Sequence, residues 1–198
     1  VLMSFAILGW IKAEIVFPYD GVTLNYTHVM FRWTQEPDCN LYNLVVINSS
    51  NDTTIDIHTS RTMYIDQTNF NWGQGYVAML NPIYENENNS QTIDTISFNI
   101  GPAYTFADLN IEIINSEDTQ DGLALFSQVS PNFRMVAIDK LGNQVWNSEF
   151  AYINHWNEHG QLFGMKDGRG VEVNFYDDIL WMTPSGTEID AHEIKQIP

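Results

Sequence analysis

The chain has 198 residues, of which 44% are hydrophobic and 13% aromatic, enough for packed cores in one large domain or two small ones. Its formal net charge of −17 repels nucleic-acid phosphates and anionic membrane surfaces, so neither is expected as a partner. The single cysteine, Cys39, cannot form an intramolecular disulfide, and no Cys and His cluster predicts a bound metal. No cofactor-binding fingerprint is present either.

An apolar run, VLMSFAILGWI, opens the chain and is followed by Lys12 and Ala13. It has the length of the hydrophobic part of a signal peptide and is too short to span a membrane. We expect residues 1–13 to be the remnant of an export signal, which places the mature protein in the periplasm or outside the cell. A buried N-terminal strand is the alternative.

Short strand-like runs separated by turns fill residues 14–101. In HVMFRW, Val29, Phe31 and Trp33 alternate with His28, Met30 and Arg32, as in a half-buried strand. The runs LYNLVVIN, TIDIH, TMYI and GYVAML follow, and their spacing predicts a β-sandwich of about seven strands. Together with FPYDG and FNWGQGYVAML, the pattern resembles fibronectin type III and immunoglobulin-like modules, which often serve as spacers or binding platforms.

Four sequons for asparagine glycosylation fall near predicted turns, at Asn25, Asn48, Asn51 and Asn88. Such matches also arise by chance in a chain rich in asparagine. Their positions indicate that these segments are exposed.

The second half contains a repeat. NFRMVAID continues into KLGNQVW through a predicted tight turn in which Gly142 takes a positive φ. ILWMTPSGTEI aligns with VAIDKLGNQVW, so that Gly186 matches Gly142, 44 residues earlier, and Ile189 matches Val145. This period is typical of propeller blades. We therefore expect an all-β chain in which residues 102–198 form the first blades of an incomplete β-propeller.

The stretches DGLALFSQVSPNFRMVAIDKLGNQVW and HGQLFGMKDGRGVEVNFYDDILWMTP, with the terminal AHEIKQIP, resemble the opening blades of the bacterial arylsulfotransferase family. The resemblance implies a β-sandwich ahead of a six-bladed propeller. It also implies transfer of a sulfuryl group from an aryl sulfate ester to a phenol, without a nucleotide donor, through a transiently sulfated histidine.

The first histidine motif of that family resembles HH-D/E-x-x-x-LPNG. Here His192 and Glu193 match its second histidine and acid, and Ala191 stands at the place of the first histidine. Strand alternation places His192 on the same face as Asp190, which could orient the imidazole ring. His192 is the candidate sulfate contact, because an imidazole can attack sulfur or donate an N–H near neutral pH. A histidine on a solvated strand edge is the alternative.

The sulfated histidine and the arginine of the family would lie beyond Pro198, so we expect the chain to be a fragment that is inactive alone and exposes strand edges. The enzyme assignment is therefore uncertain. A non-catalytic extracellular binding or adhesion protein is the alternative function, since a fold does not fix an activity.

The other candidate sites are weaker. Arg134 lies within a predicted strand and is the best candidate for a counter-charge to sulfate, ahead of Lys140 and of the hairpin-tip residues Lys166 and Arg169. His155 and His159 have a spacing that could hold a metal on a helix, but the residues around them favour a loop. Three further acidic features read as turns: Asp177, Asp178 and the segment 115–122, which lacks the spacing of a calcium loop.

Overall fold

The computed structural model describes residues 12–84, 92–104, 117, 121–128, 134–148, 152–190 and 194. Every helix or strand assigned in these ranges is a β-strand, and none of the sheets is closed, which confirms the all-β class. Among the described residues, no helix has the length and apolarity needed to cross a membrane. The chain divides into an N-terminal unit, Val1–Thr23 with His28–Ile100, and a C-terminal unit, Leu24–Thr27 with Gly101–Pro198.

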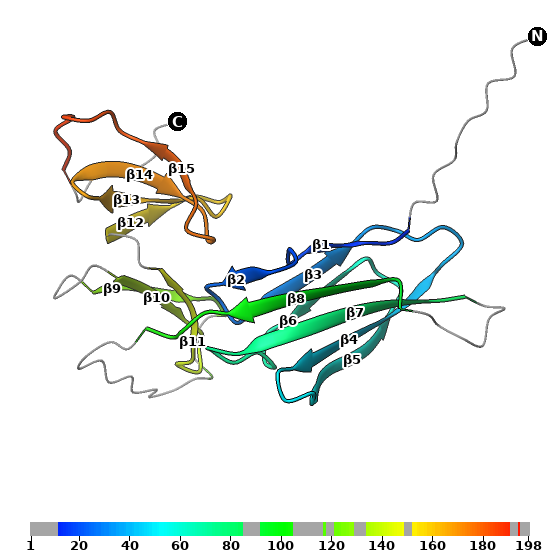
Figure 1. Ribbon diagram of the computed structural model, residues 1–198. Coiled ribbons are helices and arrows are strands. Elements are labelled where there is room, and N and C mark those ends of the chain that lie inside the picture. Colours follow the sequence, from blue (N-terminus) through cyan, green and yellow to red (C-terminus); the bar gives the residue numbers. More distant parts are fainter. Residues whose placement is uncertain are drawn as a thin grey trace, which may run out of the picture. The chain divides into compact units, whose positions relative to one another are not determined.

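Two sheets form the N-terminal unit (Figure 1). The three-stranded sheet has the order β1-β3-β6, with β1 (Ile15–Phe17), β3 (Val29–Trp33) and β6 (Met63–Asp66). The five-stranded sheet has the order β2-β8-β7-β4-β5, with β2 (Val22–Leu24), β4 (Leu41–Asn48), β5 (Thr53–Thr59), β7 (Gly75–Ile83) and β8 (Asp94–Ile100).

Aromatic side chains from both sheets make the core of this unit. Phe31 on β3 lies 5.8 Å from Phe98 on β8, and Trp33 lies 5.6 Å from Tyr42 on β4, measured between ring centroids. Val29, Phe31 and Trp33 are buried, whereas Arg32 between them is exposed. The alternation predicted for this strand is therefore confirmed, and it aims these three side chains at the second sheet.

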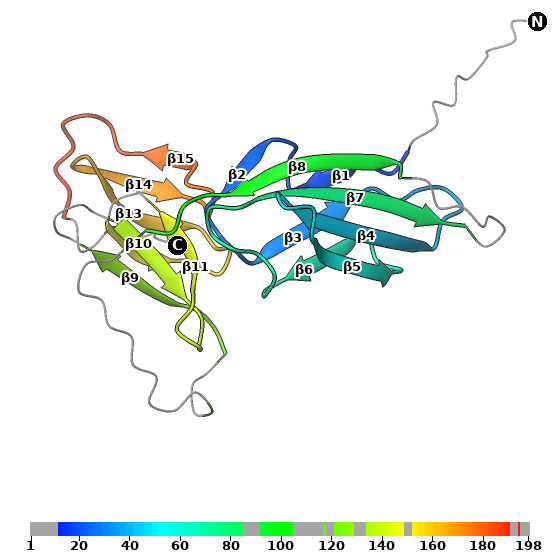
Figure 2. The ribbon, with the colours of Figure 1, turned by 60° about the horizontal axis from the view of Figure 1, so that its bottom comes forward.

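The C-terminal unit contains two antiparallel sheets, and in each of them strands adjacent in sequence pair with one another (Figure 2). The three-stranded sheet comprises β9 (Ala124–Gln128), β10 (Arg134–Ile138) and β11 (Gln144–Ser148). The four-stranded sheet comprises β12 (Tyr152–Trp156), β13 (Leu162–Lys166), β14 (Arg169–Val173) and β15 (Ile179–Met182).

The two sheets of this unit share one hydrophobic cluster. It draws on β10 and β11 of the first sheet and on β12, β13 and β14 of the second; its buried members are Met135, Ala137, Val145, Trp146, Ile153, Leu162, Val171 and Val173. Trp146 also donates its indole N–H to the carbonyl of Phe175 at 2.8 Å. Burial of these apolar side chains is what holds the two sheets face to face.

Leu24, the last residue of β2, and residues 25–27, which follow it before β3, belong to the C-terminal unit. Tyr26 forms an antiparallel bridge with Trp146 on β11. The N–H of Thr27 donates to the carbonyl of Val145, and the N–H of Asn147 donates to the carbonyl of Asn25, both at 2.9 Å. This pairing was not predicted from the sequence.

Four hairpin turns share one pattern of hydrogen bonds. In each, an Asn or Asp side-chain oxygen accepts the N–H groups of the second and fourth residues after it, and the third residue has a positive φ. The turns begin at Asn48, Asp139, Asn157 and Asn174. Gly142 has φ 81°, as predicted. The pattern explains why Asn, Asp and Gly recur at these places.

Candidate functional site

The predicted sulfate contact, His192, lies outside the described residues, as do Ala191, Glu193 and the segment 195–198. Its described neighbour Ile194 lies against β14: a Cβ built on Gly170 would stand 3.7 Å from both the Cδ1 and the Cγ2 of Ile194. Residues 187–190 form no strand, so Ile189 differs from its repeat partner Val145, which lies on β11. The role of His192 stays a prediction.

Arg134 lies on β10 and is half-buried. Its guanidinium carbon stands 4.7 Å from the centroid of the Tyr104 ring, a distance at which a cation is attracted to an aromatic face. Its predicted contact with substrate stays a prediction.

The two histidines whose spacing could hold a metal on a helix lie on a strand and in a turn instead. His155 is on β12, with its ring centroid 5.9 Å from that of Phe163. His159 is in the exposed turn that begins at Asn157, and its Nε2 is 3.8 Å from a carboxylate oxygen of Glu158. The helix needed for the metal pair is therefore absent at this place. Across the described part of the chain, no group of three or more His, Cys, Asp or Glu residues could hold a metal.

The remaining charged candidates have structural roles. Asp177, at φ 65°, and Asp178 belong to the turn that begins at Asn174, as predicted. Asp167 and Gly168 have positive φ and form the β13–β14 hairpin tip. Arg169 at this tip donates to the carbonyl of Thr183. Lys140 forms an ion pair with Asp121, an acid of segment 115–122, at 2.5 Å.

Two of the four sequons carry asparagine side chains that hold local structure. The Nδ2 of Asn25 donates to the carbonyl of Asn147 at 2.8 Å, and the Oδ1 of Asn48 accepts two backbone N–H groups of its turn. Asn51 is exposed at φ 65° in that same turn, as the sequence indicated. Asn88 lies outside the described residues.

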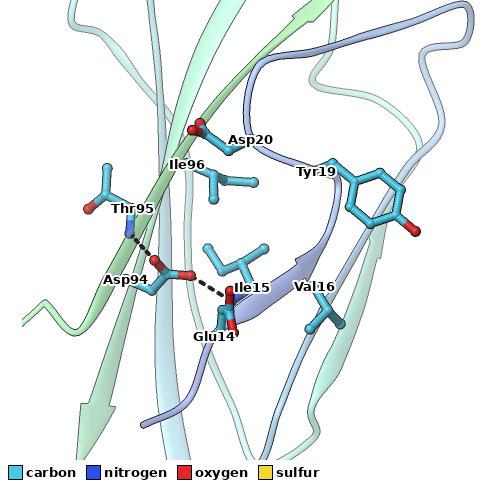
Figure 3. A pocket seen from close by; sticks show the side chains of 8 residues that line it. All are labelled: Glu14, Ile15, Val16, Tyr19, Asp20, Asp94, Thr95 and Ile96. Carbon is cyan, nitrogen blue, oxygen red and sulfur yellow. Dashed lines mark hydrogen bonds between the residues drawn. The ribbon is translucent and has the colours of Figure 1, made fainter.

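The N-terminal unit has an open pocket of about 420 Å³ between β1 and the start of β8 (Figure 3). Its walls combine apolar side chains with three carboxylates and one exposed tyrosine; the lining residues are Glu14, Ile15, Val16, Tyr19, Asp20, Asp94, Thr95 and Ile96. Tyr19 is 65% exposed and projects away from β8 in Figure 3.

Two of the pocket's carboxylates are already used by the fold. Asp94 accepts the N–H of Ile15 at 2.7 Å and the N–H of Thr95 at 2.9 Å, which ties β1 to β8 (Figure 3). Asp20 accepts the backbone N–H and the hydroxyl of Ser97 at 2.8 and 3.1 Å. These hydrogen bonds hold the pKa of Asp20 below its usual range, because they stabilise the charged form. A negatively charged pocket repels sulfate, so this pocket does not suit the predicted reaction.

An exposed apolar strand, β15, lies at the edge of the four-stranded sheet of the C-terminal unit. Ile179, Leu180 and Trp181 on β15 are 42%, 51% and 52% exposed. Since β15 pairs with β14 on one side only, its other edge lacks a described partner strand. Contiguous patches of exposed apolar side chains are typical of surfaces that bind other molecules.

No family model matches the chain, and no curated protein matches it.

Proposed function

We propose that the N-terminal unit is a β-sandwich and that the C-terminal unit supplies propeller blades to an exported arylsulfotransferase-like protein. One observation carries the proposal: the two stretches that resemble the family coincide with the two sheets of the C-terminal unit. The first, 121–146, covers β9, β10 and most of β11, and the second, 159–184, covers β13, β14 and β15. Successive antiparallel sheets that share a core support the proposal, because a propeller is built from successive four-stranded sheets.

In the proposed reaction, a histidine attacks the sulfur of an aryl sulfate, an S–N bond forms and the S–O bond to the phenolate breaks. A phenol then attacks the same sulfur, the S–N bond breaks, and the phenol's proton passes to a base. The transferred group carries its charge on the outer oxygens, by analogy with phosphoryl transfer, so positioned donors and cations lower the barrier. We assign His192 as a donor to sulfate and Arg134 as a counter-charge.

The proposal is tested with the full-length gene product, 4-nitrophenyl sulfate as donor and phenol as acceptor. Release of 4-nitrophenolate that depends on phenol is expected. His192→Ala is expected to lower kcat by roughly 100-fold or more, the usual effect of removing one positioned donor. His159→Ala is the matched control, because His159 is exposed in a turn. Equal activity of both variants would contradict the assignment of His192 as a donor to sulfate. Absence of any sulfuryl transfer would contradict the enzyme proposal.

A second candidate is a non-catalytic binding or adhesion protein. The exposed Ile179, Leu180 and Trp181 on β15 favour it, since apolar residues of this kind commonly bind other surfaces. It predicts no sulfuryl transfer with any aryl sulfate. It also predicts that Trp181→Ser abolishes binding to the partner while leaving the thermal unfolding of the protein unchanged.

A further inference from the structure

Leu24–Thr27 lies along the edge of β11 that does not pair with β10. We infer that this segment, which we call the strap, is the fourth strand of that sheet and that β10 and β11 are stable only while the strap is paired. The inference does not rest on the proposed function. It would hold equally for an enzyme and for a binding protein.

The pairing has the hydrogen-bond geometry of one antiparallel bridge. The Thr27 N–H to Val145 carbonyl bond and the Asn147 N–H to Asn25 carbonyl bond are both 2.9 Å long and bracket the Tyr26 and Trp146 pair. In an antiparallel ladder, the bracketed pair has no hydrogen bonds of its own and its side chains come closest. The Nδ2 of Asn25 adds a third bond, 2.8 Å long, to the carbonyl of Asn147.

The edge of β11 that the strap covers is buried, so leaving it unpaired would lower the stability of the fold. Val145, Trp146 and Asn147 are 4%, 3% and 2% exposed. Removal of the strap would leave the N–H of Asn147 and the carbonyl of Val145 without these partners. A buried backbone group that loses its partner destabilises the fold.

The strap also holds the chain where it enters the C-terminal unit. The N–H of Gly101 donates to the carbonyl of Leu24 at 2.8 Å, and the Nδ2 of Asn147 donates to the carbonyl of Pro102 at 3.0 Å. The strap, β11 and residues 101–102 are thus joined by one set of hydrogen bonds. Loss of the strap would leave, of these bonds, only the one from Asn147 to Pro102 between β11 and residues 101–102.

Tyr26 anchors the strap in the hydrophobic cluster. Its side chain packs against the buried residues shared by the two sheets, and its ring centroid is 5.8 Å from that of Tyr176. Burial raises the pKa of the Tyr26 hydroxyl, as expected for a phenol removed from water. The strap therefore contributes to the core as well as to the ladder.

The strands that flank the strap in the sequence explain how it is positioned for pairing with β11. It is continuous with β2, which ends at Leu24, and it precedes β3, which begins at Val29. Folding of the N-terminal unit fixes both flanks, which lowers the entropy that the strap loses when it pairs. With the strap, the first sheet has four strands, the same number as the sheet of β12–β15.

A cysteine pair in the full chain tests the pairing. Thr27 and Val145 face each other in the ladder, both are buried and both are close to cysteine in size, and the distance between paired strands suits a disulfide. Thr27→Cys/Val145→Cys is expected to form the disulfide under mild oxidation, detected as the linked peptide by mass spectrometry. Thr23→Cys/Val145→Cys is the matched control and is expected to stay reduced. Failure of the first pair, or equal reaction of the second, overturns the inference.

Hydrogen exchange in the full chain tests the dependence. Thr27→Pro removes the N–H that donates to Val145. Amide exchange in residues 134–148 is expected to accelerate roughly tenfold or more, about the effect of one lost buried hydrogen bond, while exchange in β4 and β7 stays unchanged. Ser49→Pro, at an exposed turn position of the N-terminal unit, is the control. Unchanged exchange in residues 134–148, or equal acceleration in β4 and β7, overturns the inference.

Discussion

The strands of the two units bury their side chains in different ways. In β4 and β7 of the N-terminal unit, buried residues alternate with more exposed ones, whereas β10 and β11 of the C-terminal unit each end in four successive buried residues. A strand with one covered face shows alternation, and a strand covered on both faces reads as a continuous buried run. The comparison predicts that the stability of the N-terminal unit depends on its aromatic core. The stability of the C-terminal unit is expected to depend on close contacts between its packed strands.

The largest effect is expected in the aromatic core of the N-terminal unit. Phe98 is 1% exposed and its ring lies between 5.6 and 5.8 Å from the rings of Phe31, Phe70 and Tyr76. Phe98→Ala should lower the free energy of unfolding by about 3–5 kcal/mol, because it leaves a cavity among these rings. Denaturant titration followed by circular dichroism measures the change. Tyr19→Ala, at an exposed position, is the control and should change the stability little.

A smaller loss, and a sharper test of the comparison, comes from two glycines on strands. A Cβ on Gly164 of β13 would stand 2.0 Å from the carbonyl oxygen of Tyr152 and 2.8 Å from the Cα of Ile153, whereas a Cβ on Gly75 of β7 would meet a side-chain oxygen of Asn99 at 3.0 Å. Gly164→Ala should destabilise by about 1–3 kcal/mol or more, since the backbone of β12 must move.

Gly75→Ala should cost less than Gly164→Ala, because the side chain of Asn99 can turn away. Thermal unfolding of the two variants measures the difference. Equal losses would contradict the view that β12 and β13 approach each other more closely at Gly164 than β7 and β8 do at Gly75.

The four hairpin turns have the same backbone geometry, but the residue with positive φ differs between them. Its contribution to stability can therefore be compared between turns. Gly142 and Asp177 occupy equivalent positions with φ 81° and 65°. Gly142→Ala should destabilise by about 1–2 kcal/mol, the usual cost of a left-handed conformation for an L-residue with a side chain. Asp177→Gly should change stability by less than about 1 kcal/mol, since aspartate tolerates this conformation. Urea unfolding of both variants checks the ranking, and a larger loss for Asp177→Gly would contradict it.

Much of the strand layout could be predicted because it depends on local pattern. LYNLVVIN coincides with β4, HVMFRW contains β3, and the turns at Gly142 and at Asp177 follow from their residue types. The strap could not be predicted in this way. It pairs Tyr26 with Trp146 across a separation of more than a hundred residues, and no local periodicity records which distant edge a short segment such as LNYT will meet.

The candidate site was less predictable than the fold for the same reason. The sequence favoured a loop around His155 and His159, but only His159 lies in a turn, whereas His155 lies on β12. The pocket beside Asp94 brings together residues 14–20 and 94–96. Neither segment carries a sequence pattern that predicts its contact with the other. A binding or catalytic site is formed by contacts between residues that are distant in the sequence, whereas hydrophobic periodicity describes only residues that are close together along one strand.

The smallest predicted effect contrasts the two aspartates whose pKa values are lowered. Ser97 holds the pKa of Asp20 down by hydrogen bonds, and Lys140 holds the pKa of Asp121 down by a hydrogen bond and by its charge. In both cases the folded pKa is below the unfolded one. The stabilisation is therefore present at neutral pH and is lost as pH falls through the folded pKa, below about pH 4.

Salt separates the two causes. At an ionic strength of about 1 M, where the Debye length is about 3 Å, the attraction of an exposed ion pair is screened, so the pKa of Asp121 should rise toward its usual range. The pKa of Asp20 should stay low, because its partners are the neutral N–H and hydroxyl of Ser97. Carboxyl chemical shifts followed by NMR from pH 2 to 6 measure both, at low and high salt. Lys140→Ala should reproduce the effect of salt on Asp121 alone; an equal rise for Asp20 would mean that charge, and not hydrogen bonding, holds its pKa down.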